Sequence, residues 1–103
     1  MFYAKIGLVV NMEIEFYKND KLINIDPSGI TISLDNLTIK KENEENIIIL
    51  DFKNKKCFFT MKAENIELQI PVISMEHCIK THEKSHFIYV LESEPEVINK
   101  ILI

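Results

Sequence analysis

Histidine and cysteine side chains, which are common zinc ligands, gather in the last third of the chain. They are Cys78, His82 and His86, spaced by four residues, with His77 beside them and Cys57 as a candidate fourth ligand. Zinc takes three or four nitrogen or sulfur ligands in a tetrahedral arrangement, and spacing by four would place such ligands on one face of a helix. The segment instead has the pattern of a strand, a loop and a strand, and no two cysteines are closely spaced as in zinc fingers. We therefore expect no metal site.

The same residues make a poor catalytic centre. A nucleophilic cysteine needs an imidazole to activate it and a third group to orient that imidazole. Cys78 and His77 are neighbours, so on a strand they point to opposite faces, and nothing singles out a histidine as the partner of Cys57. The only glycines, Gly7 and Gly29, stand alone, so the sequence has no glycine-rich phosphate loop. We expect no enzyme activity, no cofactor, and two buried free thiols.

Charge and composition narrow the class of protein further. The chain has 103 residues, a formal net charge of −4 and a hydrophobic fraction of 47%, which fits one globular domain over residues 1–103. All twelve basic residues are lysine. Arginine is preferred for phosphate and base contacts, so its absence predicts no nucleic-acid partner, although an AT-rich genome would deplete arginine as well. With no signal peptide and no membrane-spanning run, we expect an intracellular protein of the cytoplasm or nucleus.

The opening segment, Phe2 to Tyr17, has the strongest pattern in the chain. Every even position is apolar, and most odd positions are small, polar or charged. A period of two predicts a strand with one buried and one solvated face. A straight strand of this length would run roughly 50 Å, about twice the diameter of such a domain, so the segment must bend or fold back. Gly7 is the expected bend, and a tight corner at Asn11 is the alternative.

Further strands and turns follow at short spacing. Asp26-Pro27-Ser28-Gly29 is the clearest turn, and the apolar runs on either side of Lys53-Asn54-Lys55-Lys56 predict a hairpin. Pro71 cannot donate to a ladder and marks a sheet edge, a bulge or a strand start. Residues 72–79 alternate as a strand would, although Ser74 could cap a helical turn. His86 to Leu91 is the last expected strand, so the strands lie within residues 2–92.

The pattern then changes from a period of two to a helical period. Ser93-Glu94-Pro95-Glu96 has the form of a capping box, with a serine at the cap, proline in the first turn and glutamate three residues on. Val97, Ile98, Ile101 and Leu102 would share one helical face. A closing helix over about residues 94–102 is therefore predicted, and its apolar end would plug a barrel or pair with another copy.

About eight strands followed by one helix predict a mainly antiparallel β-barrel or roll of 7–8 strands. In the order of these elements the chain resembles pleckstrin-homology-like (PH-like) domains. The resemblance lies in "IELQIPVISMEHCI", a polar turn, "SHFIYVL" and then "ESEPEVINKIL", from Ile66 to Ile103. It implies a non-catalytic β-barrel that binds a partner. A calycin-like barrel enclosing a small apolar ligand is the rival architecture.

The resemblance implies two kinds of binding. PH-like domains capture lipid head groups through basic residues at strand–strand loops, for which this chain offers Lys18, Lys21, Lys53, Lys55 and Lys56. Two or three lysines give only weak membrane adhesion, at roughly 1 kcal/mol each.

The second kind is recognition of a protein through a sheet edge or an acidic surface. The acidic candidates are Glu42, Glu44, Glu45, Glu92, Glu94 and Glu96, which would favour a basic partner. We expect a non-catalytic module that binds such a protein partner, with a barrel holding a lipid or other apolar ligand as the alternative. An internal cavity beyond about 300 Å³ would favour the ligand.

Overall fold

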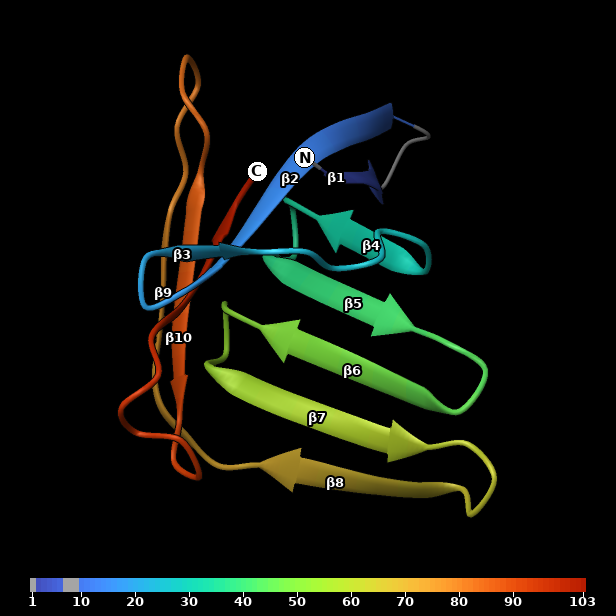
Figure 1. The fold of residues 1–103 in the computed structure, drawn as a ribbon. Coiled ribbons are helices and arrows are strands. Elements are labelled where there is room, and N and C mark those ends of the chain that lie inside the picture. The colour runs from blue at the N-terminus through green and yellow to red at the C-terminus, as the bar shows by residue number, and fades with distance from the viewer. Residues whose placement is uncertain (1, 7–9) are drawn as a thin grey trace.

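The computed structural model describes residues 2–6 and 10–103, and these residues form β-strands and no helix (Figure 1). None of the described residues forms a helix that could cross a membrane. The strands are β1 Phe2–Ile6, β2 Val10–Lys18, β3 Lys21–Ile23, β4 Ile30–Ser33, β5 Thr38–Glu42, β6 Asn46–Asp51, β7 Lys56–Met61, β8 Ile66–Ile70, β9 Val72–Cys78, β10 His86–Leu91 and β11 Asn99–Leu102.

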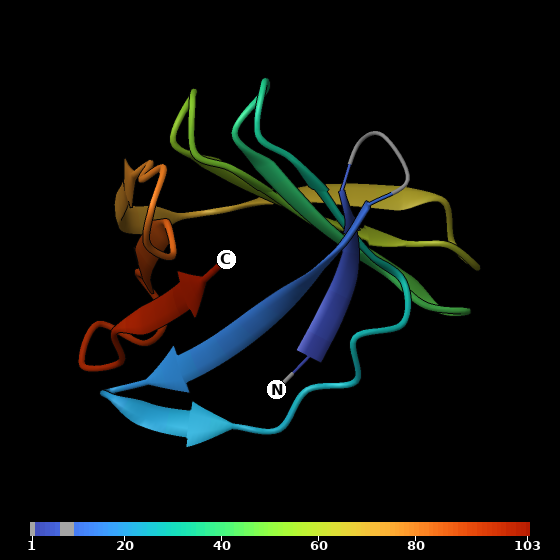
Figure 2. The same ribbon diagram turned by 90° about the horizontal axis from the view of Figure 1, so that it is seen from above.

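The strands form two antiparallel five-stranded sheets joined through β1. One sheet has the order β8-β7-β6-β5-β4, and the other has the order β9-β10-β11-β2-β3. β1 lies between them, antiparallel to β2 and parallel to β4. We call them the β4–β8 sheet and the β2–β11 sheet. Their strands cross at a steep angle, so the second sheet covers only part of the first (Figures 1 and 2).

The prediction for the opening segment is confirmed where the structure describes it. β1 and β2 fold back on each other with Ile6 opposite Val10 and Phe2 opposite Ile14, so apolar residues face apolar residues across the ladder. Ile14 and Phe16 are buried, and the odd positions Glu13, Glu15 and Tyr17 are half-buried. The bend expected at Gly7 falls outside the described residues. The alternative corner at Asn11 is wrong, because Asn11 pairs with Lys5 inside the ladder.

Tight turns lead from strand to strand in both sheets. Between β2 and β3, Asn19 and Asp20 both have positive φ, of 48° and 64°, as a two-residue hairpin turn requires. The turn predicted at Asp26-Pro27-Ser28-Gly29 forms one residue later. The Ile30 N–H donates to the Pro27 carbonyl at 3.3 Å, and Gly29 has a φ of 77°. The hairpin expected around Lys53 to Lys56 is present as β6 and β7.

The core lies where the two sheets face each other. Ile32, Ile39, Leu50 and Cys57 come from the β4–β8 sheet, and Ile14, Phe16, Met75, Phe87 and Ile101 come from the β2–β11 sheet. Phe52, at the end of β6, packs its ring edge-to-face on Phe87, with 5.1 Å between ring centroids, and lies 6.2 Å from the Tyr89 ring. These rings join the two sheets at one end of the interface.

The predicted closing helix over residues 94–102 is wrong. Two successive turns, from the Glu94 N–H to the Leu91 carbonyl and from the Val97 N–H to the Glu94 carbonyl, lead into β11, which pairs with β2 and β10. Asn99, Ile101 and Ile103 alternate as buried residues. A helix of about nine residues is marginal alone, whereas the β-branched residues here suit a strand and the open side of β2 offers a ladder. Self-association through such a helix is therefore excluded.

The closed barrel is also wrong. β8 and β9 are the terminal strands of the described sheet order, and they do not pair with each other although they follow one another in sequence. Pro71 lies between them at the corner where the chain leaves one sheet for the other. Because proline has no N–H, it suits this break between two edge strands. The molecule is an open pair of crossed sheets.

Candidate functional site

The open edge of β8 is the most accessible part of the β4–β8 sheet. β8 pairs with β7 on one side only, and it is a terminal strand among the described residues. Four of its five residues are exposed, including Ile66 at 42% and Leu68 at 46%. An edge strand that carries exposed apolar side chains is a template for pairing with another chain.

The direction of the backbone groups along β8 follows from its neighbours. The Lys62 N–H donates to the Glu45 carbonyl at 2.9 Å, so the N–H of Lys62 points toward β6. Backbone groups alternate in direction along a strand, and Met61 and Phe59 therefore turn theirs toward β8. Their register partners on β8 are Ile66 and Leu68. The N–H and carbonyl groups of the intervening residues, Glu67 and Gln69, consequently point to the open edge.

An exposed apolar strip runs inward from this edge. Ile48, Phe59 and Leu68 lie side by side on β6, β7 and β8, and Met61 and Ile66 form the next pair along β7 and β8. We call these five residues the apolar strip. They share the inner face of the sheet with buried Leu50 and Cys57, but Ile48 is 36% exposed because the β2–β11 sheet does not extend over this end. Apolar side chains are thus left uncovered on the inner face of the sheet.

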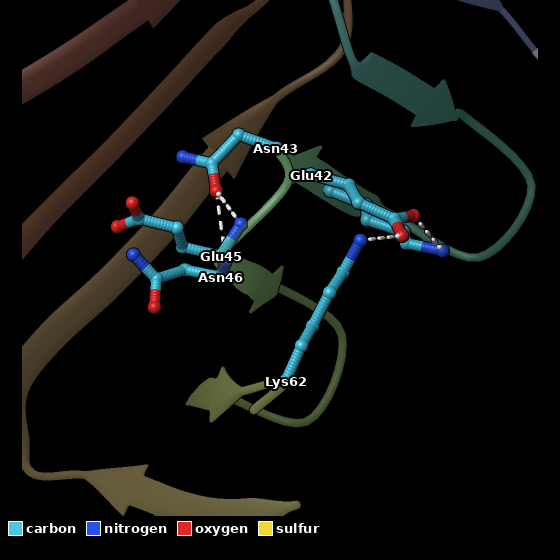
Figure 3. A network of polar contacts seen from close by, with 6 residues as sticks. Glu42, Asn43, Glu45, Asn46 and Lys62 are labelled. Carbon is cyan, nitrogen blue, oxygen red and sulfur yellow. Dashed lines mark hydrogen bonds and ion pairs between the residues drawn. The ribbon is translucent and has the colours of Figure 1, made fainter. Parts of the chain in front are cut away.

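Acidic side chains border the strip. Glu44 and Glu45 in the β5–β6 loop and Glu64 in the β7–β8 turn line a surface hollow together with Met61. We call these three carboxylates the acidic rim. The loop is held by the Asn43 side chain, whose Oδ1 accepts the N–H groups of Glu45 at 2.8 Å and Asn46 at 2.7 Å (Figure 3). The rim is therefore attached to a defined loop beside the open edge.

Glu42, which the sequence grouped with this rim, has a different role. Its carboxylate pairs with the Lys62 ammonium at 2.6 Å and with the Lys40 ammonium at 3.4 Å (Figure 3). The hydrogen bond from Lys62 is the main cause that lowers the pKa of Glu42, with Lys40 second. Glu42 is ionised and compensated, so it adds little to an acidic surface.

The second predicted acidic group lies elsewhere. Glu92, Glu94 and Glu96 are all exposed in the β10–β11 connection, where the Glu92 N–H donates to the Pro71 carbonyl at 3.1 Å. This connection and the β5–β6 loop lie on different sides of the molecule (Figure 1). The six carboxylates named from the sequence therefore do not form one surface.

The lysines predicted for lipid head groups are also split. Lys18 and Lys21 face each other across the β2–β3 turn, whereas Lys53 and Lys55 lie in the β6–β7 turn and Lys56 begins β7. Figure 2 shows these two turns on opposite sides of the molecule. The fold does not combine the two groups into one basic surface.

The cysteines and histidines are only partly brought together. Cys78 on β9 is opposite His86 on β10, while His82 is in the connecting loop and Cys57 is in the core. The described residues contain no group of three or more potential metal ligands. Burial raises the pKa of the Cys57 thiol, which makes it a weak nucleophile. Both thiols are free, and Cys78 is exposed, contrary to the expectation that both are buried.

A small cavity lies between the sheets, near the apolar strip. It has a volume of about 220 Å³, its walls are mostly apolar, and Lys18 and Lys41 line it as well. This volume is below the roughly 300 Å³ typical of sites for drug-sized ligands. Neither the cavity nor the apolar strip was predicted from the sequence. Its only signal for the strip was the alternation of Ile66, Leu68 and Ile70 directly before Pro71.

Comparisons with known proteins found no relative of this chain. No family model matches the chain, and neither a curated protein nor a solved structure matches it. The resemblance to PH-like domains thus depends on the order of elements alone, and the closing helix on which it partly relied is a strand.

Proposed function

We propose that the protein is a non-catalytic interaction module that binds an extended segment of a protein partner along the β8 edge. The observation that carries this proposal is the open edge of β8 next to an uncovered apolar strip. In β-strand addition, main-chain hydrogen bonds supply affinity and pockets for alternate side chains supply specificity. Glu67 and Gln69 offer the main-chain groups, and the strip offers the apolar surface.

The geometry of the β8 edge indicates which residue types the partner segment should carry at alternate positions. Successive residues of an added strand point to opposite faces, so every second residue would lie on the inner face beside Leu68 and Ile66. Apolar residues are expected at those positions. The residues between them would lie on the outer face, beside Glu67, and basic side chains are favoured there.

The acidic rim supports a partner of basic charge. Glu44, Glu45 and Glu64 are exposed, and no ion pair compensates them among the described residues. Exposed charges of this kind raise the rate of encounter with an oppositely charged partner more than they raise affinity. We therefore expect association to slow as salt concentration rises, because exposed charges are screened.

The test is selection of binders from a library of displayed random peptides, followed by NMR mapping of a selected peptide on the isotope-labelled protein. We expect peptides with alternating apolar and basic residues, and the largest amide shifts at β7 and β8. Gln69→Pro removes an N–H that points to the open edge without removing a β7–β8 hydrogen bond, and it should weaken peptide binding by about tenfold.

Gln69→Thr is the matched control, because it changes the same side chain and keeps the N–H. It should bind the peptide nearly as well as the unchanged protein. Two results would refute the proposal: selected peptides whose amide shifts fall outside β7 and β8, or equal binding by Gln69→Pro and Gln69→Thr.

A further inference from the structure

The cavity between the two sheets combines an apolar wall with two positive charges. Ile39, Ile48 and Leu50 line it from the β4–β8 sheet, and Phe16 and Ile101 line it from the β2–β11 sheet. Lys41 comes from the first sheet and Lys18 from the second. Two strands far apart in sequence thus each contribute one lysine to the lining of the same small cavity.

Both lysines occupy inward-facing positions in their strands. Lys41 is two residues after buried Ile39, and its register partners are Ile30 on β4 and Ile48 on β6, so it interrupts an apolar row. Lys18 follows Ile14 and Phe16 on the same face of β2, but at the end of the strand, where it is exposed, whereas Lys41 is half-buried. Inward charges can protect an edge strand from pairing, but β5 has neighbours on both sides, so that explanation does not apply to Lys41.

Neither lysine is compensated by a nearby carboxylate. Lys40, Lys62, Lys80, Lys84 and Lys100 each form an ion pair, whereas no carboxylate of the described residues is within 4.0 Å of Lys18 or Lys41. Asp26 interacts with Lys41 only at longer range, and its carboxylate already accepts the Ser28 N–H at 3.0 Å. The cavity therefore has a positive potential without a fixed counter-charge on its wall.

The remaining polar group on the wall is the Tyr89 phenol. Burial raises the pKa of Tyr89 to about 12, so the hydroxyl is neutral at physiological pH and adds no negative charge. The centroid of the Tyr89 ring lies 6.2 Å from that of the Phe52 ring. None of the side chains that line the cavity is therefore negatively charged.

We propose that this cavity binds a small anionic amphiphile, namely a carboxylate attached to a short acyl chain or a single ring. The carboxylate would lie between Lys18 and Lys41, and the apolar part would contact Ile39 and Leu50. Size supports a small ligand, because an apolar cavity of about 150 Å³ holds one benzene and this one measures about 220 Å³. The site shares Ile48 with the apolar strip, but it does not use the open backbone edge of β8 and does not depend on the proposed peptide binding.

The test uses three ligands with the same chain length and different head groups: octanoate, octanol and octylamine. Each is titrated into the labelled protein while amide shifts are followed. We expect octanoate to bind most tightly and to shift amides of β2, β5 and β6, octanol to bind more weakly at the same residues, and octylamine not to bind there. Equal binding by octylamine and octanoate, or no shifts from octanoate at 10 mM ligand, would overturn the proposal.

Charge-removing variants sharpen this test. Lys18→Gln with Lys41→Gln should weaken octanoate binding by about tenfold or more and leave octanol binding unchanged, because only the carboxylate loses its partners. Lys53→Gln with Lys55→Gln, which removes the same charge from the remote β6–β7 turn, is the control. An equal loss in the control would show that net charge alone attracts octanoate, and the site would be rejected.

A second variant distinguishes loss of binding from loss of folding. Ile48→Trp adds volume at the edge of the cavity, on a half-exposed side chain, and should abolish binding of both octanoate and octanol while the thermal midpoint changes little. Gln69→Pro should bind octanoate normally, which separates this site from the proposed peptide edge. Octanoate binding that survives Ile48→Trp would place the ligand elsewhere and refute the proposal.

Discussion

Two neighbouring rows of side chains cross the inner face of the β4–β8 sheet, and only one of them is covered. The covered row contains Ile32, Ile39, Leu50 and Cys57, all buried, whereas the open row contains Ile48, Phe59 and Leu68, all partly exposed. Both rows belong to the same hairpins and are mostly apolar, although the open row continues through Lys41 to buried Ile30 on β4. The difference arises because the β2–β11 sheet crosses only one end of the β4–β8 sheet. Stability should therefore depend on the covered row, and the open row is free to bind.

The largest expected effect is the difference in stability loss between two phenylalanine-to-alanine substitutions. One lies at the covered end of the β4–β8 sheet and the other at the open end. Phe52→Ala removes a ring that is 1% exposed and packs on Phe87 and Tyr89, so it should lower the free energy of unfolding by about 3–5 kcal/mol. Phe59→Ala removes a half-buried ring from the apolar strip and should cost about 1–2 kcal/mol. Urea denaturation followed by circular dichroism measures both values.

This pair of variants tests directly whether the covered row contributes more to stability than the open row. Equal losses at Phe52 and Phe59 would mean that the open row contributes as much to stability as the covered row. The apolar strip would then be a structural surface, and its proposed role in binding would lose its main support.

The second-largest expected loss of stability comes from substituting Gly29. This residue lies in the turn before β4, and its backbone joins β4 to the end of β5 at the open end. The Glu42 N–H donates to the Gly29 carbonyl at 2.9 Å, and a Cβ on Gly29 would lie 1.9 Å from the Glu42 carbonyl oxygen. Gly29 also has a φ of 77°, which non-glycine residues adopt at a cost of about 1–3 kcal/mol. Gly29→Ala should therefore lower the free energy of unfolding by at least that amount.

Ser28→Ala is the matched control for Gly29→Ala, because Ser28 is exposed in the same turn and its φ is not positive. It should cost less than about 0.5 kcal/mol, in line with most surface substitutions. If Gly29→Ala and Ser28→Ala were equally tolerated, the open end would be loose enough to absorb the displaced Glu42 backbone, and a defined peptide edge would be untenable.

Most strands could be predicted because their signals are local. Alternation identified β2 and β9, and the turn residues Lys53 to Lys56 predicted the hairpin of β6 and β7. The last segment could not be resolved in this way. Residues 93–96 satisfy the rules of a helix start, while Asn99, Ile101 and Ile103 alternate as in a strand, so local patterns support both structures. The deciding contact is the open side of β2, which lies about eighty residues away in the chain.

The candidate site was less predictable than the strands for the same reason. The sequence identified Glu44 and Glu45 as exposed carboxylates, but it could not show that Lys62, on another hairpin, compensates Glu42. Nor could it show that Lys18 and Lys41 meet in one cavity, because that depends on how the two sheets cross. Residue type and spacing predict which face a side chain occupies, and only the arrangement of the sheets determines what covers that face.

The smallest expected effect is the pH dependence that Glu42 gives to the open end. Its hydrogen bonds to Lys62 and Lys40 lower the pKa of Glu42 in the folded protein below its ordinary value of 4.5. Its ion pairs therefore stabilise the fold fully above about pH 4.5, and this contribution disappears as pH falls through the lowered folded pKa. The contribution is small, because the side chains of Glu42 and Lys62 are 39% and 34% exposed and water screens them.

Urea denaturation of the unchanged protein and of Glu42→Gln, each at pH 6 and pH 3, isolates this contribution. The unchanged protein should be the more stable of the two at pH 6, and the difference should shrink toward zero at pH 3, since the other carboxylates titrate alike in both. Glu44→Gln, which removes one carboxylate from an exposed neighbour with no ion pair among the described residues, is the matched control. If the Glu42→Gln difference were the same at both pH values, the carboxylate would act through packing and not through charge. Glu42 would then be available to the acidic rim, because Lys62 would not be compensating it.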